Sequence, residues 1–515
     1  MKRQRLSVGC LAVVLATTGL AAAASTPSCD GPRQTPDPLS PPCIPTWSGS
    51  NGGSTWIGVT SDQIKVVLYN DLGVAGDMNS AWSPTDETVT HFVDTSGQTT
   101  NLVRTVKALT AAFNGAFQTY GRTVSIIGVP SALGTSSSCV DRESDIEGAI
   151  VEHQPFAIFA AGSDMGCSAA RAARAGVPTL GAMDLARQAE LGTASTLIHT
   201  FSPTIDQLSQ AMASFLCGTL SGPARFASGT LAGSPRTLGL IFPSGSPSPL
   251  ATHAAEIAGL LAPTCGKTLR LARSYRPSQP AELVTAVAEM ATAQITTLVC
   301  LCPAERDALL AISSASGLLY QPEWVWSPAT RMDRAMWQRR TPSLQQRHLG
   351  ISDLWLAPAT QFQHATAMAL RGDPTLDPNP RYTTDLYLTL RTGFTGIQMA
   401  GPTLTPGSVR LGFESLAPSN AAPGTVQGGF GLPTPNSFTD TFVAWWWDPA
   451  GASPGDTASR GCVRYAAEGA RYSQTTWPLN DLSLFATGPC TGLLHRSLLD
   501  ESVLMAVRSA PVSGP

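Results

Sequence analysis

Short apolar runs alternate with amphipathic segments along most of the chain. In the clearest unit, residues 143–184, the apolar run Phe156–Ala161 follows a helical segment. An Ala/Arg-rich segment that stops at Gly176 comes next, followed by a second apolar run, Val177–Met183. Unbroken apolar runs of this length are typical of parallel strands, which are buried on both faces. The unit therefore predicts a strand, a helix and a second strand in a parallel sheet.

The same alternation extends to both sides of this unit. The first series contains strands and helices at Ile64–Tyr69, Asn101–Tyr120, Thr123–Val129 and Asp141–His153. The second contains Ile205–Leu220, Thr237–Phe242, Pro249–Leu261, Thr268–Ser274, Ala281–Ala293, Thr296–Cys302, Glu305–Leu318 and Trp324–Trp326. Later elements are His348–Leu356, Thr383–Met399, Thr405–Leu416 and Thr441–Trp447. The alternation predicts an α/β fold with two doubly wound parallel-sheet lobes.

A polar loop, Ser163–Cys167, directly follows the strand predicted at Phe156–Ala161 and leads into a helix. Open parallel sheets bind ligands beyond the carboxyl ends of their strands, and a helix N-terminus offers unpaired N–H groups to a carboxylate or phosphate. The loop is therefore a candidate ligand site. The alternative for Ser163 is a helix N-cap, which requires no ligand.

The first 24 residues have the composition of a secretory signal peptide. Lys2, Arg3 and Arg5 precede an apolar core, and Ala21–Ala24 supply small residues before a cleavage site near Ala24. A membrane anchor is the alternative, although the apolar part is short for a bilayer span; a lipid-modified cysteine is another. We expect an exported protein, secreted or in the cell envelope, with residues 25–55 as a Pro/Ser/Gly-rich linker.

Composition narrows the possible partners and activities. Charged residues make up 13% of the chain and the formal net charge is −3, so we expect neither nucleic acid nor an anionic membrane surface as a partner. The chain contains no H-E-x-x-H and no phosphate-binding Gly-rich loop with Lys-Ser/Thr. Its 7 histidines are scattered singly. We therefore expect no enzymatic activity, no cofactor and no metal site.

The chain contains 11 cysteines, and removal of the signal segment with Cys10 leaves an even number. In an exported protein these cysteines are expected to form disulfides. Cys139 and Cys167 stand at the starts of two successive helices above one sheet edge, so they are a plausible pair. The other expectations are Cys29 with Cys43, Cys462 with Cys490, and at least one bridge among Cys217, Cys265, Cys300 and Cys302, with different partners for the last two.

Several short motifs follow one another along residues 56–450. They are Gly58–Lys65, Ala161–Cys167, Gly176–Pro178, Phe201–Pro203 and Phe442–Pro449. In these motifs and their order, the chain resembles the extracellular ligand-binding receptors of the type I periplasmic binding protein family, the group around the leucine/isoleucine/valine-binding proteins. The resemblance implies two lobes that close on a ligand by a hinge motion.

The resemblance also implies domain boundaries. Three hinge crossings are expected near residues 197–203, 348–358 and 425–440. Lobe 1 would comprise 56–200 plus 355–430, lobe 2 would comprise 201–354 plus 431–450, and 451–515 would be a C-terminal extension. The extension looks closer to long actinobacterial exported versions of the family. The Cys139–Cys167 pair matches a disulfide of amino-acid-binding members.

In amino-acid-binding relatives, the loop matching Ser163–Gly166 takes the α-carboxylate of the ligand, and the loop matching Met183–Asp184 helps to hold its ammonium group. Lobe 2 offers Ser244 and Ser246 where these relatives often have an aromatic ring, and Glu323 where they often have an acid. The expected ligand-binding residues are Asp71, Ser163, Asp164, Met165, Gly166, Met183, Asp184, Ser244, Ser246 and Glu323. A helix cap is the alternative for Asp184, and a solvated turn position is the alternative for Glu323.

The sequence therefore predicts an exported, monomeric solute-binding protein. It would capture a small polar molecule, an amino acid, amide or similar, in the cleft between the lobes and present it to the permease subunits of an ABC importer. The alternatives are a sensory ligand-binding receptor and a secreted amidase or cell-wall enzyme. The serines at 244 and 246 leave the ligand class open.

Overall fold

The computed structural model of the chain describes most of the two predicted lobes and the segments that join them. The described residues are 33–35, 37, 39–70, 83–86, 91–93, 101–130, 139–160, 166–182, 192–244, 249–302, 306–314, 319–330, 332, 348–353, 356–357, 359–378, 380–415, 429–431, 436–453, 456–479, 482–486 and 494–495. The signal peptide predicted at 1–24 lies outside them.

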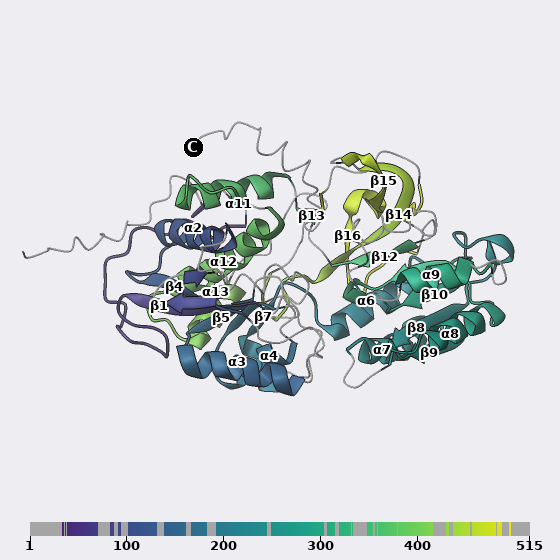
Figure 1. Ribbon diagram of the computed structural model, residues 1–515, viewed down its shortest axis with the longest axis horizontal. Coiled ribbons are helices and arrows are strands. Elements are labelled where there is room, and N and C mark those ends of the chain that lie inside the picture. The colour runs from purple at the N-terminus through teal and green to yellow at the C-terminus, as the bar shows by residue number, and fades with distance from the viewer. Residues whose placement is uncertain are drawn as a thin grey trace, which may run out of the picture.

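Lobe 1 is built on a parallel five-stranded sheet with the order β4-β1-β5-β6-β7. Its strands are β1 (Gln63–Asn70), β4 (Thr123–Pro130), β5 (Ala157–Ala160), β6 (Thr179–Ala182) and β7 (Ile198–Thr200). One face is covered by α2 (Asn101–Ala116), α11 (Ala359–Gly372), α12 (Pro380–Ala400) and α13 (Pro406–Glu414). The other is covered by α3 (Cys139–His153) and α4 (Gly166–Arg174), so the sheet lies between two helical layers (Figure 1). The small β2 (Ser83–Asp86) and β3 (His91–Val93) pair with each other.

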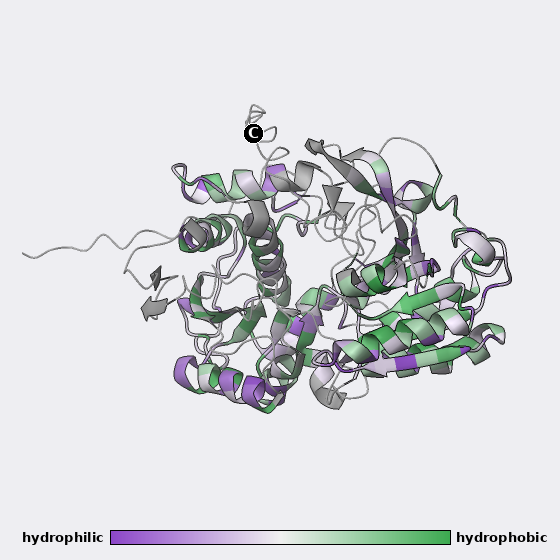
Figure 2. Ribbon diagram, turned by 45° about the vertical axis from the view of Figure 1, so that its right-hand side comes forward, coloured by the Kyte–Doolittle hydropathy of each residue, from purple (hydrophilic) through white to green (hydrophobic). Residues whose placement is uncertain are grey.

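The two buried faces explain why the strands read as unbroken apolar runs. In β1, Val66 and Leu68 enter the core beneath α2 and α12, whereas Val67 and Tyr69 enter the core beneath α3 and α4. All four side chains are fully buried. Burying an apolar side chain of this size stabilises a fold by about 1.5–3 kcal/mol, so both faces contribute. Figure 2 shows hydrophobic residues on the strands and hydrophilic residues on the outer side of lobe 1.

Lobe 2 contains a larger sheet with the order β15-β14-β12-β11-β10-β8-β9 and β16 paired to β14. Its strands are β8 (Leu238–Pro243), β9 (Leu271–Tyr275), β10 (Thr297–Cys300), β11 (Glu323–Trp326), β12 (His348–Ser352), β14 (Thr441–Ser453), β15 (Asp456–Tyr465) and β16 (Arg471–Ser473). The five neighbouring strands β9, β8, β10, β11 and β12 are parallel, and β14 pairs with β12 in the antiparallel direction. The helices α6 (Ile205–Cys217) and α7 (Pro249–Cys265) cover one face, and α8 (Pro280–Thr292) and α9 (Arg306–Ser314) cover the other.

The chain passes between the lobes three times, as predicted. It leaves lobe 1 after β7, returns after β12 through β13 (Leu356–Ala357), and enters β14 from residues 436–440. The first and third crossings lie side by side, because Thr200 and Ser437 form a parallel bridge. The Thr200 N–H donates to the Asn436 carbonyl at 2.7 Å, and the Phe438 N–H donates to the Thr200 carbonyl at 2.8 Å. The two-lobed α/β fold expected from the sequence is confirmed.

Residues before and after the two lobes differ from the predicted linker and extension. Asp37, in the segment expected to be a linker, is buried against Arg391 and Tyr387 of α12. At the other end, residues 456–473 add β15 and β16 to the lobe 2 sheet instead of forming a separate extension. Composition could not reveal this, because the segment is held by polar contacts with lobe 1, among them the Asp37–Arg391 pair and a hydrogen bond from Gln34 to the Ala116 carbonyl.

The disulfides agree with one sequence expectation and contradict another. Cys217 and Cys265 form a bridge between the ends of α6 and α7, as expected for this group of cysteines. Cys300 and Cys302, expected to have different partners, are bonded to each other. That expectation is wrong because residues two apart on a strand share a face, and β10 ends at Cys300.

Three further cysteines, Cys43, Cys167 and Cys462, are also disulfide-bonded. Cys139 begins α3, but its side chain is outside the described residues. The Cys139–Cys167 pairing therefore stays a prediction.

Candidate ligand-binding site

The carboxyl ends of both parallel sheets face the junction between the lobes. The chain leaves lobe 1 at the carboxyl end of β7, which is parallel to β6, and leaves lobe 2 at the carboxyl end of β12, which is parallel to β11. Because the carboxyl ends of parallel strands share one edge, this edge of each sheet lies at the crossings (Figure 1). Ligands of open α/β sheets bind at this edge. The junction is therefore the candidate site.

Most of the predicted ligand-binding residues follow strands that end at this edge. Those outside the described residues are Asp71, Ser163, Asp164, Met165, Met183, Asp184 and Ser246. Asp71 comes directly after β1, the residues 163–165 lie between β5 and α4, and Met183 follows β6. Gly166 is the first residue of α4. The strand ends and the helix start agree with the expected positions, and contact with a ligand stays a prediction.

On lobe 2, Ser244 lies at the expected edge. It follows β8, its side chain is partly buried, and its N–H donates to the Tyr275 carbonyl at 2.7 Å. Tyr275 ends β9, so this hydrogen bond joins the carboxyl ends of two neighbouring strands. The backbone of Ser244 is thus fixed at the side of the sheet that faces the junction, where its hydroxyl is available as a hydrogen-bond donor and acceptor.

Glu323 lies at the opposite edge, and its expected role as a ligand contact is wrong. It is the first residue of β11, so it stands at the amino end of the strand and is fully buried. Arg236 binds both carboxylate oxygens, at 2.9 and 3.0 Å. The Thr297 hydroxyl and the Phe226 N–H donate to the same carboxylate, at 2.5 and 3.1 Å. A carboxylate with these partners stabilises lobe 2 internally and does not face the junction.

The sequence prediction missed Ser327, which follows β11 at the carboxyl edge. Its hydroxyl lies 2.6 Å from Nε2 of His253, and Nδ1 of His253 lies 2.7 Å from the hydroxyl of Ser209. The Ser209 hydroxyl donates to Glu256 at 2.9 Å. Because the Ser209 hydroxyl donates its proton to Glu256, its oxygen accepts a hydrogen bond from the Nδ1–H of His253. Nε2 of His253 then has no proton and accepts a hydrogen bond from the Ser327 hydroxyl.

These hydrogen bonds fix the turn at Ser327, and they do not present its hydroxyl as an exposed nucleophile. Ser327 is 1% exposed and His253 is fully buried, and this burial lowers the pKa of His253 to about 3. The imidazole is therefore neutral at pH 7, as the chain of donors requires. The Trp326-Ser327-Pro328 sequence at the end of an apolar run is the signal that could have identified this position.

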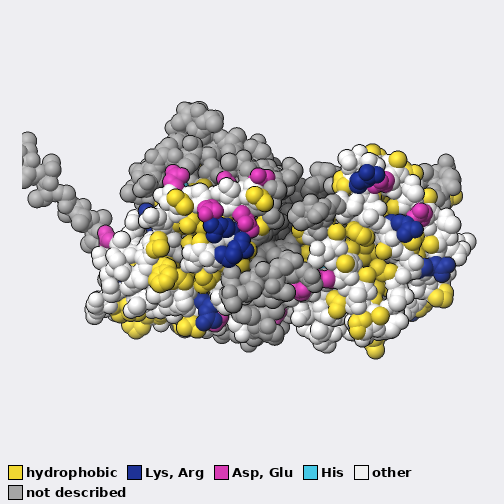
Figure 3. Space-filling model, turned by 90° about the horizontal axis from the view of Figure 1, so that it is seen from below, with side chains coloured by type: hydrophobic (Ala, Val, Ile, Leu, Met, Phe, Trp, Pro, Cys, Tyr) yellow, Lys and Arg dark blue, Asp and Glu magenta, His cyan; other side chains and the backbone are white. Residues whose placement is uncertain are grey.

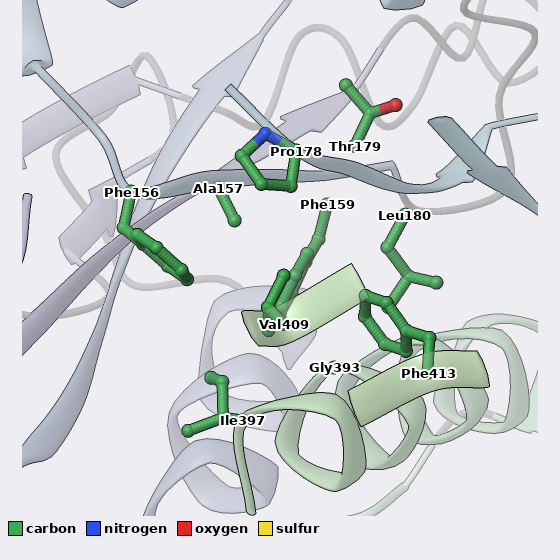
Figure 4. A pocket seen from close by; sticks show the side chains of 10 residues that line it. All are labelled: Phe156, Ala157, Phe159, Pro178, Thr179, Leu180, Gly393, Ile397, Val409 and Phe413. Atoms are coloured by element: carbon green, nitrogen blue, oxygen red, sulfur yellow. The ribbon is translucent and has the colours of Figure 1, made fainter. Parts of the chain in front are cut away.

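A small apolar cavity in lobe 1 is separate from the junction. It has a volume of about 10 Å³ and lies between β5 and β6 on one side and α12 and α13 on the other (Figure 4). Phe156, Phe159, Ile397 and Phe413 are among the side chains that line it. A space of this volume holds about one water molecule. It is a packing void beneath the sheet and not a solute site.

Two ion pairs on the underside of lobe 1 join the helices α3 and α4. Figure 3 shows Lys and Arg side chains beside Asp and Glu side chains there. Arg171 and Arg174 of α4 contact Glu147 and Glu143 of α3, and the latter pair is 2.8 Å apart. These pairs join the two helices. Across the described residues, no group of three or more His, Cys, Asp or Glu side chains is placed to hold a metal ion.

The described helices include none with the length and hydrophobicity needed to cross a membrane. Neither the protein-family models nor the curated proteins to which the chain was compared match it.

Solved structures do match. An ABC transporter solute-binding protein from R. palustris, in complex with 4-hydroxybenzoate, is 12% identical and has a TM-score of 0.51. That match covers 83% of this chain and 100% of the R. palustris chain. A possible leucine/isoleucine/valine-binding protein from Rhodopirellula baltica is 12% identical with a TM-score of 0.49, and covers 79% and 97% of the two chains. A fatty acid ABC transporter substrate-binding protein from Thermomonospora curvata is 12% identical with a TM-score of 0.49, and covers 86% and 100%.

The sheet order, the three crossings and the likeness to the R. palustris protein agree with one another. The chain has the two-lobed fold of the type I periplasmic binding proteins.

Proposed function

We propose that the protein is an extracytoplasmic solute-binding protein that captures a small polar molecule between its two lobes. The observation that carries this proposal is the position of the two carboxyl edges, which both face a junction spanned by three chain crossings. Lobes connected only by short crossings can rotate relative to each other, and closure around a ligand is the usual result in proteins of this architecture. A ligand in the junction would contact strand ends from both lobes.

The proposed contacts on lobe 1 suit a carboxylate. Ser163–Gly166 lead into α4, which starts at Gly166, and the N-terminus of a helix favours negative charge. Asp71, Met183 and Asp184 follow β1 and β6 at the same edge, where the two aspartates would hold a cationic or hydrogen-bond-donating part of the ligand. This combination fits an amino acid or a related amide.

The proposed contacts on lobe 2 are the hydroxyl groups of Ser244 and Ser246. Serine hydroxyls can donate and accept hydrogen bonds, so they suit a polar ligand without specifying its charge. The R. palustris protein binds 4-hydroxybenzoate, a small molecule that also has a carboxylate. Small aromatic acids are therefore a second group of ligands to test.

The proposed mechanism is capture followed by presentation. The monomeric protein closes on its ligand, and the closed form is recognised by the permease subunits of an ABC importer. The segment 1–24 would direct export, because it combines a charged start, an apolar core and small residues before the cleavage site. Catalysis is not part of the proposal.

The experiment is a thermal-shift screen of the purified mature protein with amino acids, amides, short peptides, sugars and small aromatic acids. A ligand that binds the folded state with a concentration 100 times its Kd stabilises it by about 2.7 kcal/mol, which a melting curve detects. Each hit is then tested by calorimetry and for chemical change. Turnover of a hit without closure of the lobes would contradict the proposal and favour the secreted-enzyme alternative.

A further inference from the structure

The segment Gly469–Pro478 lies beyond the residues expected to form lobe 2, yet it runs along the hinge. Its strand β16 pairs antiparallel with the start of β14, with Val443 opposite Arg471 and Thr441 opposite Ser473. Thr441 is the first residue of β14 and therefore ends the third crossing. Figure 1 shows β16 next to β14 on the side of lobe 2 that faces the junction.

Arg471 connects the third crossing to the second. Its Nε donates to the Thr441 hydroxyl at 3.1 Å and its Nη2 donates to the Thr441 carbonyl at 2.5 Å. The same Nη2 donates to the carbonyl of Asp353 at 3.3 Å, and Asp353 is the first residue after β12. Burial lowers the pKa of Arg471 to about 10, so the guanidinium remains charged at neutral pH. One charged guanidinium thus donates hydrogen bonds to backbone carbonyl groups of two crossings.

The same segment packs on the end of α6 that is farther from the first crossing. The Trp477 ring packs edge-on against Phe215 of α6 with centroids 5.0 Å apart, and the Thr219 hydroxyl donates to the Pro478 carbonyl at 3.3 Å. Phe215 lies near the carboxyl end of α6, which starts at Ile205 directly after the first crossing, so this contact anchors the segment inside lobe 2. Tyr472 packs on Trp477 with centroids 5.1 Å apart, which connects the strand to this contact.

A later part of the chain adds a further contact to the second crossing. The strand β17 (Leu494–His495) pairs antiparallel with β13, so that His495 is opposite Leu356. The chain that follows β14 therefore touches the second crossing on both sides of residues 354–355. This repeated contact with the crossings indicates a role in the hinge rather than in either lobe alone.

We propose that Gly469–Pro478 form a hinge brace, with Arg471 as its positioning residue, that limits the range of interlobe angles of the ligand-free protein. The proposal rests on the proposed solute-binding function, because only a protein that closes needs a controlled hinge. Hydrogen bonds from one guanidinium to two crossings keep their original geometry only when both crossings move together. Removing them should therefore loosen the coupling of the two crossings beyond the point where β12 and β14 stop pairing, at Ser352 and Val443.

The test measures the distance between one label on each lobe. Val151 of α3 is 70% exposed and Val284 of α8 is 48% exposed, so both accept a spin label without disturbing a core. A keto amino acid is used for labelling because the cysteines whose side chains the structure describes form disulfides. Pulsed electron–electron double resonance then gives the distribution of distances between the two labels in the protein without ligand.

Arg464 provides a matched control for Arg471. It lies on β15 in the same C-terminal region and binds the Asp448 carboxylate through Nε at 2.6 Å. This pair joins β14 to β15 inside lobe 2, away from the crossings. Arg464→Met therefore removes the same charge and a comparable set of hydrogen bonds without touching the hinge.

We expect Arg471→Met to broaden the distance distribution and Arg464→Met to leave it unchanged. Arg471→Lys keeps the charge but not the fork, so we expect an intermediate width; it also replaces Arg471→Met if that variant does not fold. An unchanged width for both Arg471 variants would overturn the brace, as would equal broadening in Arg464→Met. Since the measurement uses no ligand, a failed ligand screen would reject the proposed function without deciding this result.

Discussion

The buried pair of Asp37 and Arg391 gives the sharpest test of how the N-terminal segment is held. The Arg391 guanidinium and the Tyr387 hydroxyl each donate to the Asp37 carboxylate at 2.6 Å, and the Leu39 N–H donates to its other oxygen at 2.8 Å. Asp37 is 3% exposed and Arg391 is 2% exposed. These contacts place residues 33–42 within lobe 1.

Removing one partner should be costly because the other charge remains buried. Breaking a buried ion pair from one side costs about 3–5 kcal/mol. We therefore expect Asp37→Asn and Arg391→Met each to destabilise lobe 1 by about that amount. The double variant buries neither charge, so its loss of unfolding free energy should be well below the sum of the losses in the two single variants. With an m value of about 3 kcal/mol/M in urea, each single variant lowers the unfolding midpoint by about 1–2 M.

The pH dependence of the pair has a definite sign. Burial alone would raise the pKa of Asp37, but Arg391, the Tyr387 hydroxyl and the Leu39 N–H together hold this pKa below its usual value. A carboxyl group with a lowered folded-state pKa contributes stability above its unfolded-state pKa, about 3.9. That contribution is lost as the pH falls through the folded-state value, and Asp37→Asn should remove it.

The assay is urea unfolding followed by circular dichroism and by intrinsic fluorescence, with Asp373→Asn as control. Asp373 pairs with Arg104 in the same lobe at 2.6 Å, but the side chains are 27% and 38% exposed. We expect a much smaller effect there, because solvent screens an exposed pair. If Asp37→Asn unfolds at the same urea concentration as the wild type, residues 33–42 do not belong to lobe 1 and the linker expectation stands.

Three further predictions concern the site and lobe 2. For a ligand found by the screen, Ser163→Ala with Asp184→Ala should lower affinity by more than tenfold and leave the unfolding midpoint nearly unchanged; equal binding would refute these contacts. Glu323→Gln should do the opposite, with a loss of about 3 kcal/mol in urea unfolding and unaltered affinity, because a buried pair is broken far from the junction. Burial lowers the pKa of His253 to about 3, against about 6.5 in the unfolded chain, so between these pH values only the unfolded chain binds this proton. The free energy of unfolding should therefore be about 2 kcal/mol lower at pH 5 than at pH 7. Comparing this pH difference between the wild type and His253→Asn tests the last point, and an equal difference would contradict it.

Local sequence patterns were sufficient for most strands and helices. The run Thr123–Val129 became β4 and the periodic segment Thr383–Met399 became α12, each within a few residues. In a parallel sheet covered by helices, burial on both faces gives strands a continuous apolar signal, so their position can be predicted. By contrast, no helix or strand was predicted between His348–Leu356 and Thr383–Met399, although Ala359–Gly372 forms α11.

The candidate site was predictable in its location but only partly in its residues. Ser244 follows β8 at the carboxyl edge, as the strand-then-polar pattern indicates. Glu323 could not be excluded from the sequence, because its partner Arg236 lies 87 residues away and no local pattern reports their contact. The same reason applies to Asp37 and Arg391, 354 residues apart. Pairing over such distances is set by the tertiary fold.

The most direct test of the central claim is the change in interlobe distance on ligand binding. With labels at Val151 and Val284, a saturating concentration of a ligand from the screen should shift the distance distribution to shorter values and narrow it. Calorimetry under the same conditions establishes saturation. Saturated binding with an unchanged distribution would contradict the claim that the two lobes hold the solute between them.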